Sequence, residues 1–203
     1  MQRFAVFASG NGSNLQAIID AVQAGEIKAE LALVFSNRRK AYALKRAEEA
    51  GIKTLVLETR NYATPQSFDR ELAMYLKKEN IDFIILAGYM KILTPWFVKQ
   101  YDKKIINIHP SLLPAFKGAK GIKDQFTYGV KVAGVTVHIV NDKMDAGPII
   151  MQESFKVSEK ETLESLEKRI HEIEHKIFPK CVAWFVDGKL KIGARKVQVA
   201  DRK

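Results

Sequence analysis

Two polar side chains stand two residues apart at the end of an apolar run, in the stretch Asn107-Ile108-His109-Pro110. The pair Ile105-Ile106 precedes them, and Pro110 removes a backbone donor, so we expect a buried strand to end here. Because strand side chains alternate with a period of two, Asn107 and His109 lie on the same side of that strand. The amide could hold an oxygen while the imidazole exchanges a proton beside it. A strand end with a surface histidine would explain the same residues.

A carboxylate that could join this pair lies in a polar turn further along the chain. The turn, residues 141–148, separates two apolar segments at 132–140 and 149–157, which we expect to form a hairpin. Such a hairpin could return Asp145 towards His109. A lone aspartate in a turn is more usually a solvated turn former, so both interpretations stay open.

A glycine-rich turn near the N-terminus suggests an anion site. The apolar run 3–8 is followed by Ser9-Gly10-Asn11-Gly12-Ser13-Asn14 and then by apolar residues at helical spacing. Backbone N–H groups of such a turn can approach an anion at the positive end of the helix, while Ser13 and Asn14 can cap the helix or bind phosphate oxygens. The spacing matches neither the dinucleotide fingerprint nor a Walker loop. A phosphate cradle and a plain capped turn explain it equally well.

The elements that must position these residues alternate along the chain. Short, continuous apolar runs alternate with helical patterns, which is typical of a parallel sheet covered on both faces. We therefore predict an α/β fold: a Rossmann-like, mostly parallel twisted sheet with helices on both faces, an antiparallel C-terminal hairpin and a long C-terminal helix that starts at Leu163. The expected strands of the parallel part are residues 3–8, 31–35, 54–57, 83–86 and 105–108.

Three loops should meet at one edge of this sheet, because the carboxyl ends of parallel strands lie together and ligands bind where strand order reverses. They follow residues 8, 86 and 108. The stretch Met90–Leu93 in the second loop is more apolar than an exposed loop should be. It either covers the core or forms a wall of an apolar pocket, and we favour the pocket.

The composition of the 203 residues, 47% apolar and 28% charged, is that of a folded globular protein. No apolar run approaches the roughly 20 residues of a membrane span, so we expect a cytoplasmic protein with no membrane partner. The single cysteine, Cys181, lies in an apolar helical run and is expected in the core. The net charge of +10 favours anionic ligands, but the basic residues are scattered without interleaved aromatic side chains, so we expect no nucleic-acid partner.

Four motifs stand out, at residues 9–14, 86–93, 107–114 and 144–149. Together, in this order and at these intervals, they resemble the folate-dependent formyltransferases, and in particular the phosphoribosylglycinamide formyltransferase family of purine biosynthesis. The resemblance spans essentially the whole chain. It implies transfer of the formyl group of 10-formyltetrahydrofolate, as cosubstrate, to the amine of 5-phosphoribosylglycinamide, with no metal.

The resemblance also implies a role for each residue at a matching position. One domain, 1–203, would comprise a phosphate-binding half at 1–100, a catalytic and folate-binding half at 101–190 and a tail at 191–203. The catalytic trio would be Asn107, His109 and Asp145. The ribonucleotide contacts would be Gly12, Ser13, Asn14, His171, Glu172 and Glu174. The folate contacts would be Met90, Lys91, Ile92, Leu93, Asn107, Asn141, Asp142, Lys143, Met144 and Asp145.

The implied chemistry fits the residue types. An amine attacks the formyl carbon through a tetrahedral intermediate, and the Asn107 amide is a fixed donor for the developing oxyanion. A carboxylate near His109 favours the imidazolium, which adds a charge-assisted bond. Whether Asp145 only tunes His109 or also accepts the amine proton stays open.

The sequence departs from the family pattern at two places. Pro65 stands where some members carry a folate-contacting arginine, and Arg60 nearby could replace it. Lys117 and Lys120 stand where relatives have proline and histidine, so the loop there could differ in conformation; with Lys91 they could contact the folate carboxylates, or be ordinary solvated lysines.

Three other functions compete with this prediction. A formyltetrahydrofolate hydrolase uses much the same trio with water as the nucleophile, although its relatives usually carry an additional N-terminal domain. A methionyl-tRNA formyltransferase would need a further C-terminal domain. A non-enzymatic nucleotide-binding module explains the glycine-rich turn but leaves the trio without a purpose. A monomer and a homodimer are equally compatible with the sequence.

Overall fold

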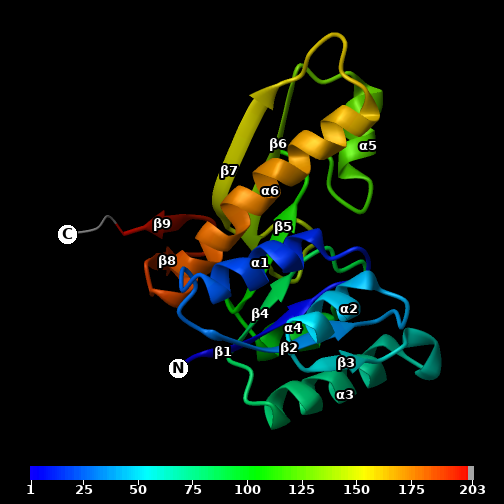
Figure 1. Cartoon of the computed structure of the whole chain (residues 1–203), viewed down its shortest axis with the longest axis vertical. Coiled ribbons are helices and arrows are strands. Elements are labelled where there is room, and N and C mark those ends of the chain that lie inside the picture. The colour runs from blue at the N-terminus through cyan, green and yellow to red at the C-terminus, as the bar shows by residue number, and fades with distance from the viewer. Residues whose placement is uncertain (201–203) are drawn as a thin grey trace.

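A seven-stranded sheet runs through the centre of the computed structural model, with strand order β3-β2-β1-β4-β5-β6-β7 (Figure 1). The structure describes residues 1–200, so the end of the expected tail at 191–203 lies outside the described residues. The seven strands are β1 (Arg3–Phe7), β2 (Glu30–Ser36), β3 (Thr54–Val56), β4 (Phe83–Leu86), β5 (Ile105–His109), β6 (Val132–Ile139) and β7 (Ile149–Lys156).

The first five strands are parallel and the last two complete the sheet in antiparallel fashion. Every residue of β4 is buried, as a strand covered on both faces requires. A separate antiparallel hairpin pairs β8 (Leu190–Ile192) with β9 (Val197–Val199). The predicted fold class is therefore confirmed, with strand bounds that differ from the expected ones only at the ends.

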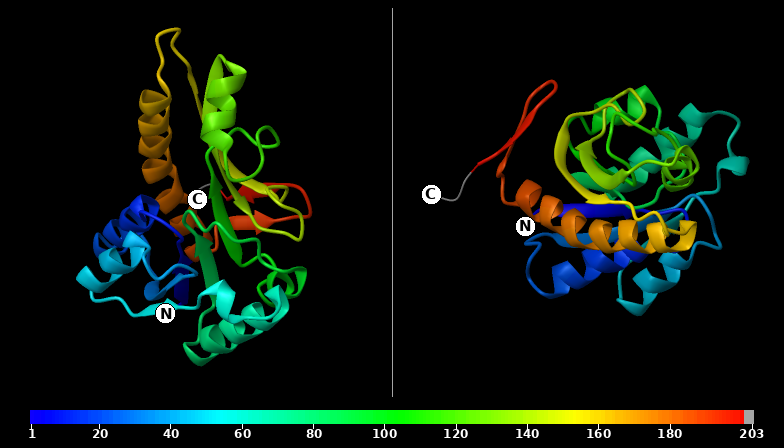
Figure 2. Two further views of the ribbon diagram at one scale, coloured as in Figure 1. Left: turned by 90° about the vertical axis from the view of Figure 1, so that its right-hand side faces the viewer. Right: turned by 90° about the horizontal axis from the view of Figure 1, so that it is seen from above.

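Helices cover both faces of the sheet (Figure 2). Two of them begin at capping boxes: Thr64 with Ser67 at the start of α3, and Thr162 with Ser165 at the start of α6. The helices are α1 (Ser13–Gln23), α2 (Tyr42–Glu49), α3 (Pro65–Lys78), α4 (Pro95–Gln100), α5 (Gly121–Tyr128) and α6 (Leu163–Val186), with a 3₁₀ turn η1 (Thr59–Asn61).

Two apolar clusters lie on the two faces of the sheet. On one face α1 and α6 run side by side over residues such as Phe4 and Ile85 (Figure 1). On the other face α3 and α4 cover residues such as Phe7 and Phe35. Cys181 is fully buried in the first cluster, as expected for core packing.

The structure adds two features to the sequence analysis. Helix α4, which begins at Pro95 behind the N-cap Thr94, was not expected, because its six residues are too few to show helical periodicity. Helix α6 continues to Val186 although Pro179 lies within it. None of the described helices combines the length and apolarity needed to cross a membrane.

Candidate active site

The candidate site lies at the carboxyl edge of the parallel strands. In the sheet β1 neighbours β4 and β4 neighbours β5, so the loops that follow these three strands lie next to one another. The strand order reverses between β1 and β4, because the chain continues to β2 on one side and to β5 on the other. A ligand is expected beyond the strand ends at this place.

Asn107 is held by a histidine on the neighbouring strand. The two residues pair in register across β5 and β6, and Asn107 Nδ2 lies 3.1 Å from His138 Nε2. Burial lowers the pKa of His138, so its imidazole is neutral; Nδ1–H donates to the Ile139 carbonyl at 3.0 Å, and Nε2 accepts from Asn107. One hydrogen of the Asn107 amide is therefore used, and the second remains available to a ligand.

His109 lies between two acceptors and is only 4% exposed. Its Nε2 contacts the Phe116 carbonyl at 2.8 Å, and its Nδ1 lies 3.5 Å from Asp145 Oδ2. An imidazole that faces an acceptor at each nitrogen satisfies both only when it is doubly protonated. The surroundings thus suit an imidazolium, whereas those of His138 suit the neutral ring.

Asp145 reaches His109 because the β6–β7 loop, which leaves β6 level with Ile105, returns towards β5 and β6. Its own backbone is left-handed (φ 48°), and its Oδ2 accepts from the Gly118 amide at 2.8 Å. Gly147 permits this return, since a Cβ there would lie 1.7 Å from the Ile139 carbonyl oxygen. The predicted approach of Asp145 to His109 is confirmed; its catalytic role stays a prediction. Asp145 Oδ1 also lies 3.7 Å from His138 Nε2, a contact that the sequence analysis did not foresee.

The four residues of the apolar stretch in the loop after β4 have different environments. Met90 and Ile92 are 54% and 72% exposed, while Leu93 is buried in the core. The Lys91 ammonium lies 4.9 Å above the Phe68 ring. The stretch thus combines both interpretations: Leu93 covers the core, and Met90 and Ile92 offer apolar surface beside the strand ends. In the β6–β7 loop Met144 is also exposed, and Lys143 N donates to the Asn141 side chain.

The glycine-rich turn leads into a helix with an open N-terminus. Helix α1 begins at Ser13 behind Gly12, whose φ of 78° is left-handed, and within residues 1–200 no side chain caps it. Of the two alternatives left open by the sequence, the plain capped turn is therefore not found, and phosphate binding by Ser13 and Asn14 stays a prediction. Asn14 instead donates from Nδ2 to Glu174 Oε2 at 2.8 Å, because α6 packs against α1. The first amides of α1 are left free for an anion.

A buried carboxylate organises the part of α6 that faces this turn. Glu174 is 3% exposed and also accepts from His171 Nδ1 at 2.8 Å. This hydrogen bond raises the pKa of His171. The structure therefore brings Asn14, His171 and Glu174 together, and their contact with the ribonucleotide stays a prediction. Glu172 is exposed and takes no part in this cluster of described residues.

Two residues that the sequence analysis missed lie at the same place. His175 has a buried Nε2 without a hydrogen-bond partner in the described chain, and its ring is nearly parallel to that of His171, with centroids 6.2 Å apart. Burial lowers the pKa of His175. Arg46 on α2 donates to the Asn11 carbonyl and side chain. The four-residue spacing of the two histidines, one helical turn, was the available signal.

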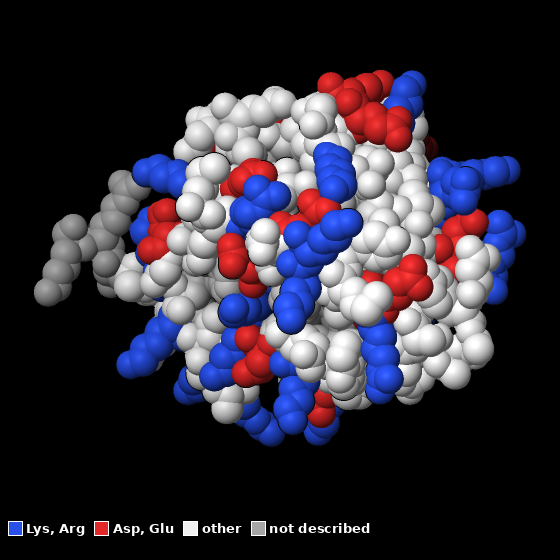
Figure 3. All heavy atoms as spheres, turned by 90° about the horizontal axis from the view of Figure 1, so that it is seen from below, with Lys and Arg blue, Asp and Glu red and all other residues white. Residues whose placement is uncertain are grey.

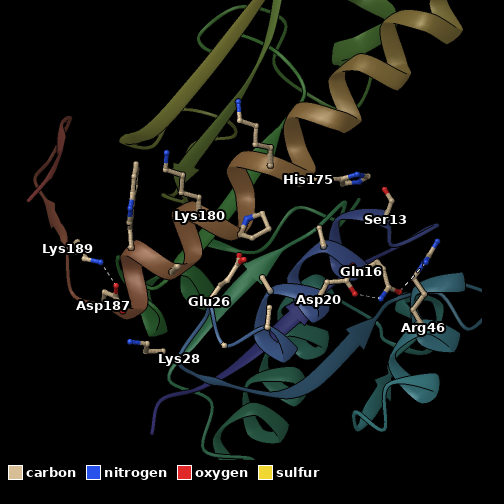
Figure 4. A pocket seen from close by; sticks show the side chains of 18 residues that line it. Ser13, Gln16, Asp20, Glu26, Lys28, Arg46, His175, Lys180, Asp187 and Lys189 are labelled. Atoms are coloured by element: carbon tan, nitrogen blue, oxygen red, sulfur yellow. Dashed lines mark hydrogen bonds and ion pairs between the residues drawn. The ribbon is translucent and has the colours of Figure 1, made fainter. Parts of the chain in front are cut away.

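Ser13, Arg46 and His175 line one end of a hollow of about 1100 Å³ between α1 and α6 (Figure 4). Glu26 and Lys28 lie at its other end (Figure 4). None of the predicted catalytic trio lines it. Within residues 1–200, no group of three or more His, Cys, Asp or Glu side chains is arranged to hold a metal ion.

The two departures from the family pattern have clear local structures. Pro65 is the first residue of α3, where its missing N–H costs no hydrogen bond. Arg60, the proposed substitute for the family arginine, is exposed and paired with Glu58 at 3.1 Å. In the loop with Lys117 and Lys120, Phe116 is left-handed (φ 52°), which turns its carbonyl towards His109.

The chain is similar to known proteins over nearly its whole length. A family model described as formyl transferase matches residues 2–182. A phosphoribosylglycinamide formyltransferase of Bacillus subtilis (strain 168) is 42% identical over 182 residues, which cover 90% of this chain and 93% of that protein. The one from Escherichia coli (strain K12) is 41% identical over 187 residues, covering 92% and 88%. The crystal structure of glycinamide ribonucleotide transformylase 1 from Symbiobacterium toebii matches with a TM-score of 0.96 at 42% identity, over 99% of this chain and 95% of that one.

Proposed function

We propose, from the premise that this chain belongs to the formyl transferase family, that it transfers the formyl group of 10-formyltetrahydrofolate to the amine of 5-phosphoribosylglycinamide. The product would be the N-formyl ribonucleotide of de novo purine biosynthesis. The observation that carries the proposal is the contact of Asp145 with His109, on the strand that also presents Asn107. The open N-terminus of α1, at the same edge of the sheet, supports a phosphorylated acceptor.

In the proposed reaction Asn107 stabilises the oxyanion. The substrate amine attacks the formyl carbon, a C–N bond forms, and the carbonyl oxygen becomes negative. The Asn107 amide hydrogen that His138 does not use is a fixed donor for this oxygen. Removal of one such donor typically lowers kcat by about 100- to 1000-fold. The oxyanion then re-forms the carbonyl and the bond to N10 of the folate breaks. The attacking nitrogen loses one proton and N10 gains one, so the amine and the folate are both neutral at the end.

His109, as imidazolium, supplies the second contact to the oxyanion. Its Nε2–H is occupied by the Phe116 carbonyl, so substrate would replace that carbonyl as the acceptor. Asp145 stabilises the positive ring from the Nδ1 side. The reaction needs no covalent enzyme intermediate, because the amine attacks the formyl carbon directly.

The ribonucleotide phosphate would bind at Gly12, Ser13 and Asn14, on the free amides of α1. Arg46 and His175 supply further donors at the same end of the hollow. His171 and Glu174 would contact the sugar side of the same substrate, and Glu172, which is exposed, has the least support. The phosphate-binding half 1–100, the catalytic half 101–190 and the tail 191–203 stay a proposed division.

The folate would lie against Met90, Ile92 and the β6–β7 loop. Exposed apolar side chains beside the strand ends, including Met144, provide the surface that a pterin ring buries. The folate residues proposed are Met90, Lys91, Ile92, Leu93, Asn107, Asn141, Asp142, Lys143, Met144 and Asp145. Of these, Leu93 is buried in the core and would support the loop rather than touch the folate. Lys91, Lys117 and Lys120 are the cations that could meet the folate carboxylates.

One assay tests the proposal. The protein is incubated with 10-formyltetrahydrofolate, with and without 5-phosphoribosylglycinamide, and formation of tetrahydrofolate is followed. Strict dependence on the ribonucleotide is expected. Turnover without it would identify a hydrolase, and no turnover in either mixture would leave only a nucleotide-binding module.

A further inference from the structure

A single buried serine connects the two loops that the proposed substrates share. We call residues 8–14 the ribonucleotide loop and residues 87–93 the folate loop. Ser9 is 2% exposed. Its backbone N–H donates to the Gly88 carbonyl at 3.1 Å, and its hydroxyl accepts from the Met90 amide at 2.9 Å. The ribonucleotide loop therefore holds the folate loop at two points through one residue.

The direction of the serine hydroxyl is set by a third residue from outside both loops. Ser9 Oγ donates its only hydrogen to Asn37 Oδ1 at 2.6 Å, which leaves the oxygen lone pairs to face Met90 N–H. Asn37 follows directly on β2, whose last residue is Ser36. The bridge is thus a built arrangement in which each partner has a defined role.

This bridge crosses the place where the strand order reverses. The ribonucleotide loop follows β1 and leads to α1 on one face of the sheet, and the folate loop follows β4 and leads to α4 on the other face. A ligand held by one loop and a ligand held by the other must meet between them. The relative position of the two ligands depends on how the two loops are connected, and the hydrogen bonds of Ser9 connect them.

We propose that Ser9, oriented by Asn37, is a positioning residue that keeps the two substrate loops in the one relative geometry that formyl transfer requires. The inference rests on the proposed function. Reaction needs the amine nitrogen about 3–3.5 Å from the formyl carbon, and a displacement of about 1 Å can cost about 100-fold in rate. Each substrate alone contacts its own loop, so the bridge matters when both are bound.

The test compares binding of each substrate with the rate of their reaction. In Ser9→Ala, the dissociation constants of 5-phosphoribosylglycinamide alone and of a non-reactive folate analogue alone, measured by calorimetry, should change by less than about threefold. The single-turnover rate with both substrates saturating should fall by about 10- to 100-fold. Thermal unfolding of the variant shows that it is folded.

The matched control is Ser36→Ala. Ser36 is also a fully buried serine at a strand end of the same edge, but among residues 1–200 its hydroxyl bonds to Arg38 N and O, each at 3.1 Å, and to neither substrate loop. Its removal should leave the single-turnover rate within about twofold of wild type, because the cost of losing a local hydrogen bond falls on stability alone. Asn37→Ala, which keeps the Ser9 hydroxyl but not its orientation, should give a smaller loss of rate than Ser9→Ala, and it tests the idea even if Ser9→Ala does not fold.

Three results would overturn the inference: a wild-type single-turnover rate in both Ser9→Ala and Asn37→Ala, an equal loss in Ser36→Ala, or a loss of binary affinity as large as the loss of rate. A wild-type protein that does not transfer the formyl group refutes the proposed function instead. The two failures are thus distinguishable.

Discussion

His109 and His138 lie on neighbouring strands, and the two oxygens of Asp145 lie within 3.5 and 3.7 Å of one nitrogen of each. Their other contacts make them different. His138 gives its Nδ1 hydrogen to a carbonyl and receives one from Asn107, so the neutral ring is satisfied. His109 meets an acceptor on each side. We infer that one imidazole orients the amide and the other carries the charge.

The first prediction concerns the proposed catalytic residues. Asp145→Asn and His109→Ala should each lower kcat by at least about 100-fold. The first removes the negative charge beside the His109 ring, and the second removes the proposed second donor to the oxyanion. The dissociation constant of the ribonucleotide should change little, since its proposed contacts lie on α1 and α6. Steady-state kinetics and calorimetry measure the two quantities. Asp102→Asn changes an exposed carboxylate that precedes the amino end of β5, whereas His109 lies at its carboxyl end, and it is the control. Near wild-type turnover in Asp145→Asn would refute the assignment.

The second prediction concerns His171, whose pKa the hydrogen bond to Glu174 raises. Stability from this pair is fully present below the ordinary imidazole pKa of about 6.5 and is lost as pH rises through the raised value. His171→Gln should therefore be less stable than wild type at pH 6, and the difference should shrink at pH 9. Urea unfolding at several pH values measures it.

His175 provides a control of opposite sign. Burial lowers its pKa, so its contribution is present above about pH 6.5 and declines as pH falls through the lowered value. His175→Gln should therefore gain stability relative to wild type on the acid side. The same pH trend in both variants would contradict the different environments of the two rings.

At the scale of elements, the start of α1 depends on how closely α2 approaches it. Gly12 lies against Ala43 on α2, and the Ala43 amide donates to the Gly10 carbonyl at 3.1 Å. A Cβ on Gly12 would lie 2.7 Å from the Ala43 Cβ. The conformation of the open turn thus depends on contacts with α2, a helix that lies about 30 residues further along the chain.

The third prediction is that Gly12→Ala destabilises the protein more than Gly51→Ala. Both glycines have left-handed φ angles, 78° and 69°, but a Cβ on Gly51 meets open space. Gly51→Ala should therefore cost only the backbone strain, roughly 1–2 kcal/mol, whereas Gly12→Ala adds the clash. Gly12→Ala should also weaken ribonucleotide binding. Urea unfolding compares the two variants. Equal losses of stability would contradict the prediction, because they would show that α2 can move away from a Cβ on Gly12 without lowering the free energy of unfolding.

At the scale of the whole molecule, the charge of +10 is spread over the surface. On the face in Figure 3, basic and acidic side chains are interspersed with uncharged ones. This distribution agrees with scattered, solvated lysines and arginines. Its effect on small anionic substrates would be a general attraction that salt screens.

The fourth prediction follows from that attraction. Because both proposed substrates are anions, kcat/KM should fall as ionic strength rises from about 0.01 to about 1 M, where the screening length shortens from about 30 to about 3 Å. The value of kcat should change little, because salt screens the short contacts of a bound substrate much less than the long-range attraction of a free one. Steady-state kinetics with sodium chloride measures both. A kcat/KM independent of salt would contradict long-range attraction.

The sequence by itself determined the parallel sheet and the place of its ligand edge, because buried strands need continuous apolar runs and their carboxyl ends lie together. It also placed Asn107 and His109 on one side of a strand, since a strand's side chains alternate with period two. Its motifs identified the family. All of these inferences rest on patterns of neighbouring residues, which can be recognised without knowing which distant side chains meet.

Only the tertiary structure decided which distant groups meet. The register between β5 and β6 placed His138 opposite Asn107, and the left-handed turn at Phe116 aimed a carbonyl at His109. The packing of α6 on α1 took Asn14 away from the helix cap, and the join at Ser9 links two loops from separate strands. Such contacts depend on register, on loop conformation and on the closure of long stretches of chain, and no local pattern of residue types encodes them.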